Sequence, residues 1–318
     1  LWGGCNSKQY YTPAATTSVG SSSSHQLISF SRDGASMEGG IALNAKQELP
    51  LKLEPGYSFI NNTADTAITA DKKGACQLHR VQGGTQTIQL PNALVAATTI
   101  GNQLVYLLQD NSYGIYDLDQ KSIIYTNSSK KVFSIDTRVA NPMWVDNLVV
   151  IPTLDGKLVI LDLKTHKVLN QIYVTTDSTL NNVIFLRRLG NTLVAATPHG
   201  VMIKNNQGRR DYKQEISEVA IDDAYIYTFT KDGMIVKLDP VLKVVAEQKY
   251  KFAHFSTAGV YSDKVFALDK QGYLIISNKN LTKHKDYKLS EVEGYSFSST
   301  GKLYYNGQVV DIASLTYE

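Results

Sequence analysis

The feature that most constrains the fold of this 318-residue chain is an internal repeat that ends in a glycine about every 40 residues. Six regular members read "DTAITADKKG", "QLVYLLQDNSYG", "NLVVIPTLDG", "NTLVAATPHG", "AYIYTFTKDG" and "DKVFALDKQG", and two less regular ones, "QLISFSRDG" and "KLYYNG", flank them. Their glycines are Gly34, Gly74, Gly114, Gly156, Gly200, Gly233, Gly272 and Gly307, which lie 33 to 44 residues apart. Such regular spacing indicates eight copies of one structural unit.

Each unit has the pattern of a β-hairpin. A run rich in Val, Ile, Leu, Tyr and Thr leads to a turn, where glycine adopts positive φ without a steric penalty, and a second such run follows. Asp162, Asp239 and Asn278 each follow their glycine by six residues, and an Asx side chain there can bond the backbone of the next turn. Further strand-like runs bring each unit to about four strands.

A single four-stranded unit cannot bury both of its faces. Stacking the units face to face buries them, and closing the stack into a ring removes the exposed ends. The sequence therefore predicts an all-β fold, one β-propeller of eight four-stranded blades over residues 26–318. Two alternatives remain open: an unclosed β-solenoid, and a seven-bladed ring in which the Gly34 and Gly307 hairpins are two halves of one blade.

The segment before the repeats has a different composition. Residues 6–25 read "NSKQYYTPAATTSVGSSSSH", small and polar residues that bury too little to repay the entropy of ordering, so residues 1–25 are predicted to form a flexible, disordered tether. The preceding "LWGGC" resembles the processing box of bacterial lipoproteins, although Trp2 stands where those proteins usually have Leu. That resemblance implies that Cys5 carries a lipid anchor.

The other cysteine, Cys76, lies in the strand-like stretch "GACQLHR". It is 71 residues from Cys5 and is expected to be a packed core thiol that forms no disulfide. The net charge of +3, from 32 basic and 29 acidic side chains, is spread along the chain in scattered pairs. This distribution gives no basic face for nucleic acid. No apolar run approaches the roughly 18 residues that span a bilayer.

The repeat itself resembles a known type. "NLVVIPTLDGKLVILDLKTHKVL" is similar to the quinoprotein-type (PQQ-like) repeat, with an apolar strand, a (D)G turn and an "LYALD"-like strand. Enzymes with this repeat hold pyrroloquinoline quinone and calcium between an adjacent-cysteine disulfide and a Trp face. This chain has two Trp, Trp2 and Trp144, and no adjacent cysteines. The cofactor of those enzymes is therefore not expected here.

No other catalytic pattern replaces that chemistry. The six histidines fall singly in predicted turns or strand ends, and no phosphate-cradling loop or nucleophile elbow is present. The sequence predicts a protein that is not an enzyme, with no catalytic residue, no cofactor and no metal ion. A ligand-binding or quinoprotein-type enzyme propeller remains the less favoured alternative.

A quinoprotein-type propeller behind a lipoprotein start resembles the BamB family of outer-membrane assembly lipoproteins. That resemblance implies a scaffold at the periplasmic side of the outer membrane of a Gram-negative bacterium, which binds other envelope proteins such as the barrel-assembly machinery. Ile184, Leu186 and Arg187, in "NNVIFLRRLGN", match an apolar-x-Leu-Arg stretch that contacts the partner in that family. The alternatives are a buried strand at this stretch, and a structural role in a secretion or motility apparatus.

Overall fold

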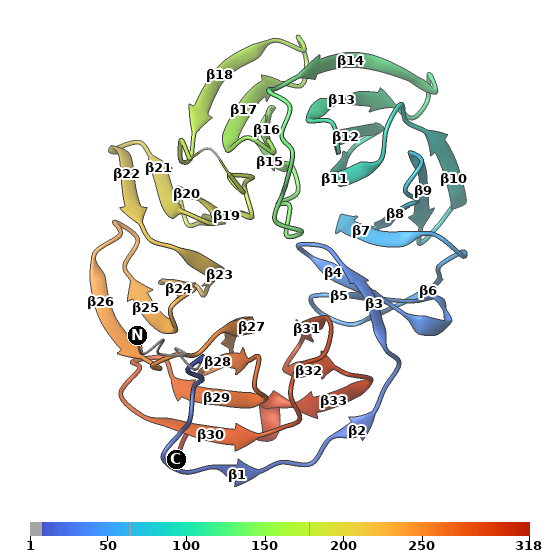
Figure 1. Cartoon of the computed structure of the whole chain (residues 1–318). Helices are drawn as coiled ribbons and strands as arrows, with labels where there is room; N and C mark the ends of the chain where they lie inside the picture. The colour runs from blue at the N-terminus through green and yellow to red at the C-terminus, as the bar shows by residue number, and fades with distance from the viewer. Residues whose placement is uncertain (1–7, 64, 178) are drawn as a thin grey trace, which may run out of the picture.

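The eight predicted units form a closed ring of eight β-sheets, or blades, around a central axis (Figure 1). The structure is a computed structural model that describes residues 8–63, 65–177 and 179–318. Within a blade the strands follow one another from the axis to the rim, and neighbouring strands are antiparallel except for β1, which pairs in parallel with β30. No helix in these residues is long and apolar enough to cross a membrane.

Four blades make up the first half of the ring. Blade 1 contains β3 (Leu27–Phe30), β4 (Gly34–Met37), β5 (Ile41–Asn44) and β6 (Glu48–Lys52), and blade 2 contains β7 (Ser58–Thr63), β8 (Thr66–Ala70), β9 (Ala75–Arg80) and β10 (Gly84–Gln89). Blade 3 contains β11 (Leu94–Ile100), β12 (Gln103–Leu108), β13 (Ser112–Asp117) and β14 (Ser122–Ser128), and blade 4 contains β15 (Met143–Val145), β16 (Leu148–Pro152), β17 (Lys157–Asp162) and β18 (Val168–Tyr173).

The second half includes strands from the N-terminal segment. Blade 5 contains β19 (Phe185–Leu189), β20 (Thr192–Thr197), β21 (Gly200–Asn205) and β22 (Gly208–Lys213), and blade 6 contains β23 (Ile216–Ile221), β24 (Ile226–Thr230), β25 (Met234–Leu238) and β26 (Val244–Lys249). Blade 7 contains β27 (Phe255–Tyr261), β28 (Lys264–Asp269), β29 (Tyr273–Asn278), β30 (His284–Lys288) and the added β1 (Thr17–Ser18). Blade 8 contains β31 (Ser296–Ser299), β32 (Lys302–Tyr305), β33 (Gln308–Asp311) and, as its outer strand, β2 (Ser22–Ser23). Two short 3₁₀ helices complete the chain, η1 (Glu38–Gly40) and η2 (Ile312–Ser314).

The apolar core is divided among the interfaces between blades. One buried cluster lies between each pair of neighbouring blades, for example Ile68 with Leu104 between blades 2 and 3. The set includes Leu27 and Met37 of blade 1 packed with Phe297 of blade 8, so the stack closes. The prediction of eight blades is confirmed. The seven-blade and open-solenoid alternatives are wrong, because Gly34 and Gly307 belong to separate blades of a closed ring.

The repeat glycines serve two different purposes. Gly74, Gly156, Gly233, Gly272 and Gly307 have φ between +67° and +93° and lie in the turn between the second and third strands of their blades, as predicted. Gly114 and Gly200 lie inside or at the start of a strand without positive φ, and a Cβ on Gly114 would sit 2.3 Å from the Tyr125 carbonyl. Gly34 does not lie in the predicted turn between the second and third strands, because it follows the first strand of blade 1. The turn between the second and third strands of that blade contains Gly39 and Gly40.

The predicted Asx turns are confirmed. The side-chain Oδ1 of Asp162 accepts hydrogen bonds from the backbone of Lys164 and Thr165 at 2.9 and 2.7 Å. Asp239 and Asn278 cap the equivalent turns of blades 6 and 7 in the same way. Each carboxylate or amide thus satisfies donors that the turn leaves without a ladder partner.

The N-terminal segment divides into two parts. Residues 1–7, which include Cys5, lie outside the described residues, so the flexible start and the lipid anchor stay predictions. Residues 8–25 differ from the expected tether, because they run along the rim of blades 7 and 8 (Figure 1). There β1 pairs with β30, β2 pairs with β33, and Tyr11 is buried. These strand contacts use backbone hydrogen bonds, which place little demand on side chains, so composition gave no sign of them.

Candidate functional site

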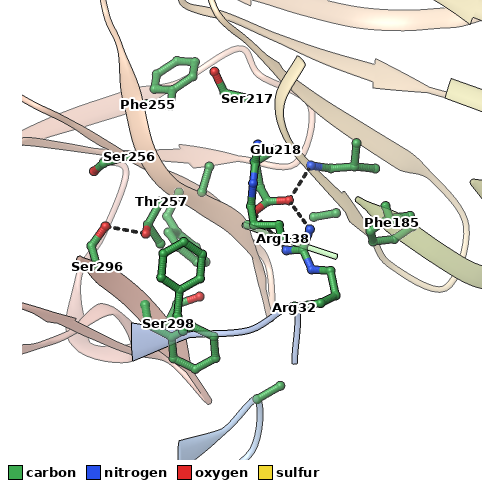
Figure 2. A pocket seen from close by; sticks show the side chains of 18 of the residues that line it. Arg32, Arg138, Phe185, Ser217, Glu218, Phe255, Ser256, Thr257, Ser296 and Ser298 are labelled. Atoms are coloured by element: carbon green, nitrogen blue, oxygen red, sulfur yellow. Dashed lines mark hydrogen bonds and ion pairs between the residues drawn. The ribbon is translucent and has the colours of Figure 1, made fainter. Parts of the chain in front are cut away.

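The ring encloses an axial cavity of about 630 Å³. Its wall comes mainly from the inner strands β23, β27 and β31, with the β3–β4 turn of blade 1 reaching in from the other side (Figure 2). Hydroxyl groups line it beside aromatic rings, and Thr257 and Ser296 form a 2.6 Å hydrogen bond in its wall. The volume falls within the range of small-molecule pockets, about 300–1,000 Å³.

A charged network crosses the axis at one side of this cavity. Arg32, in the β3–β4 turn, donates two hydrogen bonds of 2.9 Å to the Glu218 carboxylate of blade 6 and one of 2.9 Å to the Ile184 carbonyl of blade 5. Both charged side chains are mostly buried, 13% and 14% exposed. Blades that are not neighbours along the ring are therefore tied together through its centre.

Two further arginines extend the network. Arg138 pairs with Asp136 and lies 3.8 Å from Glu218. Burial alone would raise the pKa of Asp136, but hydrogen bonds and the charge of Arg138 outweigh it and hold that pKa below its usual range. Asp33 accepts from Arg187 and, at 2.7 Å, from Asn141. The paired charges of this network thus link blades 1, 5 and 6 with the connection that precedes blade 4.

The predicted partner-binding stretch is divided by the structure. Ile184 and Leu186 are fully buried between blades 4, 5 and 6, so neither can contact a partner at the surface of the ring. Their placement agrees with the alternative of a buried strand. Arg187 is 39% exposed and faces the axial cavity beside Asp33. Of the three residues, only Arg187 can meet another protein in the folded ring, and its role in docking stays a prediction.

Cys76 lies in the core of blade 2, and His199 lies between two connections of neighbouring blades. Cys76 is fully buried, as predicted, and burial raises the pKa of its thiol to about 12. His199 links two connections between blades: its Nδ1 is 2.8 Å from Glu215 and its Nε2 is 2.8 Å from the Thr179 carbonyl. Within residues 8–63, 65–177 and 179–318, no group of three or more His, Cys, Asp or Glu side chains is placed to hold a metal ion.

The rim is the second candidate surface. Tyr11 lies in a groove beside the outer strands of blades 6 and 7, where its hydroxyl donates to Asp286 at 2.9 Å and its ring packs edge-on against Tyr250 and Tyr273. Burial, followed by the Asp286 carboxylate, raises the pKa of Tyr11. Elsewhere on the described surface, the exposed large apolar side chains include Phe133 and Trp144 near blade 4, Leu169 and Tyr173 on β18, and Val244 and Val245 on β26.

Sequence reasoning missed the residues that build these two surfaces. Arg32 and Asp33 were visible in "SRDG", where an unusual charged pair precedes the glycine, but their partners lie more than 100 positions away. Tyr11 was visible as an aromatic residue in an otherwise polar segment. Neither sequence feature shows which residues it contacts, because those contacts form only when the ring closes.

Comparisons with known proteins give one related protein and a widely shared fold. No family model matches the chain. The chain is 24% and 23% identical to the plasminogen-binding protein PgbB of two Helicobacter pylori strains, over 94% and 95% of its own length. It spans 65% of the length of those relatives.

Solved structures resemble the whole ring at low sequence identity. BamB from Moraxella catarrhalis matches with a TM-score of 0.68 and 14% identity, over 93% of this chain and 98% of BamB. The C-terminal WD40 domain of Sif2 matches with 0.67 and 12%, over 93% and 99%, and the computationally designed Ika8 protein with 0.62 and 13%, over 92% and 97%. Because these proteins differ widely, the likeness defines the fold and not the role. The fold of this chain is that of a BamB-like β-propeller.

Proposed function

We propose that this chain is a non-enzymatic, protein-binding propeller of the bacterial cell envelope. The observation that carries the proposal is the likeness along nearly its whole length to a protein named for binding another protein. A rigid ring suits that role, because it presents many loops and strand edges at fixed positions. The finer role is a BamB-like scaffold at the periplasmic side of the outer membrane, which assists the assembly of outer-membrane proteins.

The proposed anchor is a lipid on Cys5. Because Tyr11 is fixed to blade 7, six residue steps separate the anchor from the ring. These steps span at most about 20 Å. The rim near blade 7 would then stay close to the membrane, which raises its effective concentration there. Mass spectrometry of the mature N-terminus tests the anchor: a diacylglycerol mass on Cys5 supports it, and an unmodified Cys5 or an intact preceding segment contradicts it.

The docking role is tested at Arg187 by co-purification from envelope extracts. Arg187→Glu would set a carboxylate against Asp33, so Arg187→Gln, which removes the charge and keeps the size, is the cleaner variant. The exposed Arg188→Gln on the same strand is the matched control. We expect Arg187→Gln to reduce recovery of the barrel-assembly subunit at least tenfold while circular dichroism shows that the ring is folded, with a lower Tm because Asp33 loses its charged partner. Equal recovery of the subunit with both variants would show that Arg187 does not contribute to the interface. Recovery of a secretion or motility complex in place of that subunit would favour a structural role in that apparatus.

Plasminogen binding is a second candidate, favoured by the name of the related protein. The test is binding of purified plasminogen to the immobilised chain, with the heat-unfolded chain as control. Saturable binding to the folded chain alone would support it. Binding to neither form would contradict it, and equal binding to both forms would show that the interaction does not depend on the folded ring.

A further inference from the structure

The outermost strand of each blade has one edge that faces the rim. In blades 7 and 8 a strand from the N-terminal segment of the same chain pairs with that edge. β1 pairs with β30 of blade 7, and β2 completes blade 8 against β33. In the part of the chain that the structure describes, no strand pairs with the outer edge of β6, β10, β14, β18, β22 or β26. Unpaired edges invite another strand unless charge or proline blocks them.

The edge of β18 lacks the protection seen on several of the others. Its sequence "VLNQIY" contains no charged residue and no proline, and two of its large side chains are exposed, Leu169 at 57% and Tyr173 at 47%. By contrast β22 reads "GRRDYK", β26 reads "VVAEQK", and β6 contains Pro50. β10 and β14 are also uncharged, but β10 exposes no large apolar side chain and β14 exposes one, Ile123.

Backbone groups on this edge are occupied by side chains that a strand can displace. The amide of Gln171 donates to the Asn170 side chain at 2.8 Å, and the Tyr173 carbonyl accepts from Arg209 of blade 5 at 2.7 Å. Both groups therefore point away from β17, toward the outside of blade 4. These exposed side-chain contacts occupy the positions where a neighbouring strand would pair.

The molecule already shows an outer strand accepting another. Thr17 and Ser18 align with Tyr287 and Lys288 in parallel, so blade 7 has five strands. Figure 1 shows β18 in the corresponding position on the outer rim of blade 4. We propose that the β18 edge binds an extended, uncharged segment of a partner protein with alternating apolar residues, as the fifth strand of that blade. This inference rests on the proposed protein-binding function and deepens it.

Backbone pairing gives affinity at such an edge, while alternate side chains give selectivity. Leu169 and Tyr173 are the exposed apolar side chains of this edge: Tyr173 shares a strand face with Gln171, and Leu169 lies at a β-bulge where it has no partner on β17. An incoming segment that places an apolar residue beside each of them buries both contacts. A positively charged segment gains the pairing but meets the Lys157 ammonium, which lies 5.7 Å from the centre of the Tyr173 ring.

The probe is a fluorescent peptide with uncharged ends, acetyl-Ser-Thr-Val-Thr-Val-Thr-Val-Ser-amide, titrated with the full chain by anisotropy. Gln171→Pro removes the outward N–H, and Leu169→Lys adds a blocking charge. Glu247→Pro is the matched control, because Glu247 of β26 pairs with Val236 of β25 in the same way as Gln171 of β18 pairs with Val159 of β17. We expect saturable binding that falls at least tenfold in both β18 variants and less than twofold in the control. Circular dichroism and Tm verify that each variant is folded.

Equal loss in all three variants, no loss in the β18 variants, or no peptide binding to the parent chain would overturn the inference. Recovery of an envelope partner from cell extracts, measured on the same proteins, tests the proposed function separately. If the peptide does not bind but an envelope partner is still recovered, only the proposal for the β18 edge is wrong. If no envelope partner is recovered, the proposed protein-binding function is contradicted.

Discussion

At the residue scale, the stability of the ring depends on charges that the sequence could not connect. Arg32 and Glu218 are 186 positions apart and lie in different blades, yet each satisfies the other near the axis. A buried guanidinium or carboxylate persists only when it is paired, so the contact requires the ring to close first. Composition and local pattern carry no information about such a pair.

Removing one partner should therefore cost more than removing both. Glu218→Gln leaves Arg32 largely buried with a weaker acceptor, and we expect it to lower the free energy of unfolding by about 2–4 kcal/mol. Urea denaturation measures this loss, with the exposed Glu247→Gln as control. The double change Arg32→Leu with Glu218→Leu should lose less than the sum of the single changes Arg32→Leu and Glu218→Leu. Additive losses would show that the two side chains do not interact.

Cys76 gives a second prediction at this scale. Burial raises its thiol pKa to about 12, so thiolate is scarce near neutral pH and the sulfur is shielded from reagents. In a Cys5→Ser background, we expect Ellman's reagent to label less than a tenth of the chain in its native state at pH 8 and the full amount in 6 M guanidinium. Rapid labelling of the native chain would mean that blade 2 opens locally.

At the scale of the element, the sequence predicted best where one strand and one turn decide the geometry. Alternating apolar residues, turn glycines such as Gly233, and the Asx caps at Asp162 and Asp239 are local signals, and the structure confirms them. The prediction erred at Gly34, because "SRDG" resembles the turn between second and third strands but follows the first strand. It also overlooked "MEGG", whose two glycines make the true turn of blade 1.

The connections between blades offer a prediction about pH. Burial alone would lower the pKa of His199, but the Glu215 hydrogen bond, the Thr179 carbonyl and nearby acidic charges raise it above its usual value. A raised pKa in the folded state means that this stabilisation is fully present below pH about 6.5 and is lost as pH rises through the folded-state pKa.

His199→Gln tests that dependence. Glu215 is 59% exposed and screened by solvent, so we expect the variant to lose about 0.5–1 kcal/mol relative to the parent at pH 5.5 and less at pH 8.5. Urea denaturation at both pH values measures the difference. His25→Gln, at an exposed position, is the control. A loss that does not change with pH would assign the contribution of His199 to its neutral hydrogen bonds.

At the scale of the whole molecule, the number of blades and the closure of the ring follow from counting repeats. The strand that completes the last blade does not. Eight units predicted eight blades, but the last blade has three strands of its own and takes its fourth, β2, from the N-terminal segment. The axial cavity and the rim edges arise from how blades meet. The cavity could not be predicted from any one repeat, because its wall combines strands from several blades.

The contribution of the N-terminal strands and Tyr11 to the stability of the ring can be measured by truncation. A chain that starts at Gln26 lacks β1, β2 and Tyr11, so β33 gains an open edge and Tyr250 and Tyr273 lose an aromatic neighbour. Burying one aromatic side chain contributes about 2 kcal/mol and its hydrogen bond about 1 kcal/mol. A loss of about 3 kcal/mol corresponds to a Tm roughly 5–10 °C lower.

A chain that starts at Lys8 is the matched control, since it keeps every N-terminal contact described for the ring, and its Tm should equal that of the parent. Tyr11→Ala in that background separates the aromatic anchor from the two strand pairings. If Tyr11→Ala accounts for the whole loss, the strands of residues 17–23 add nothing to the closure of blade 8. An equal Tm for the chains that start at Lys8 and at Gln26 would contradict that contribution altogether, because blade 8 would then be stable with three strands.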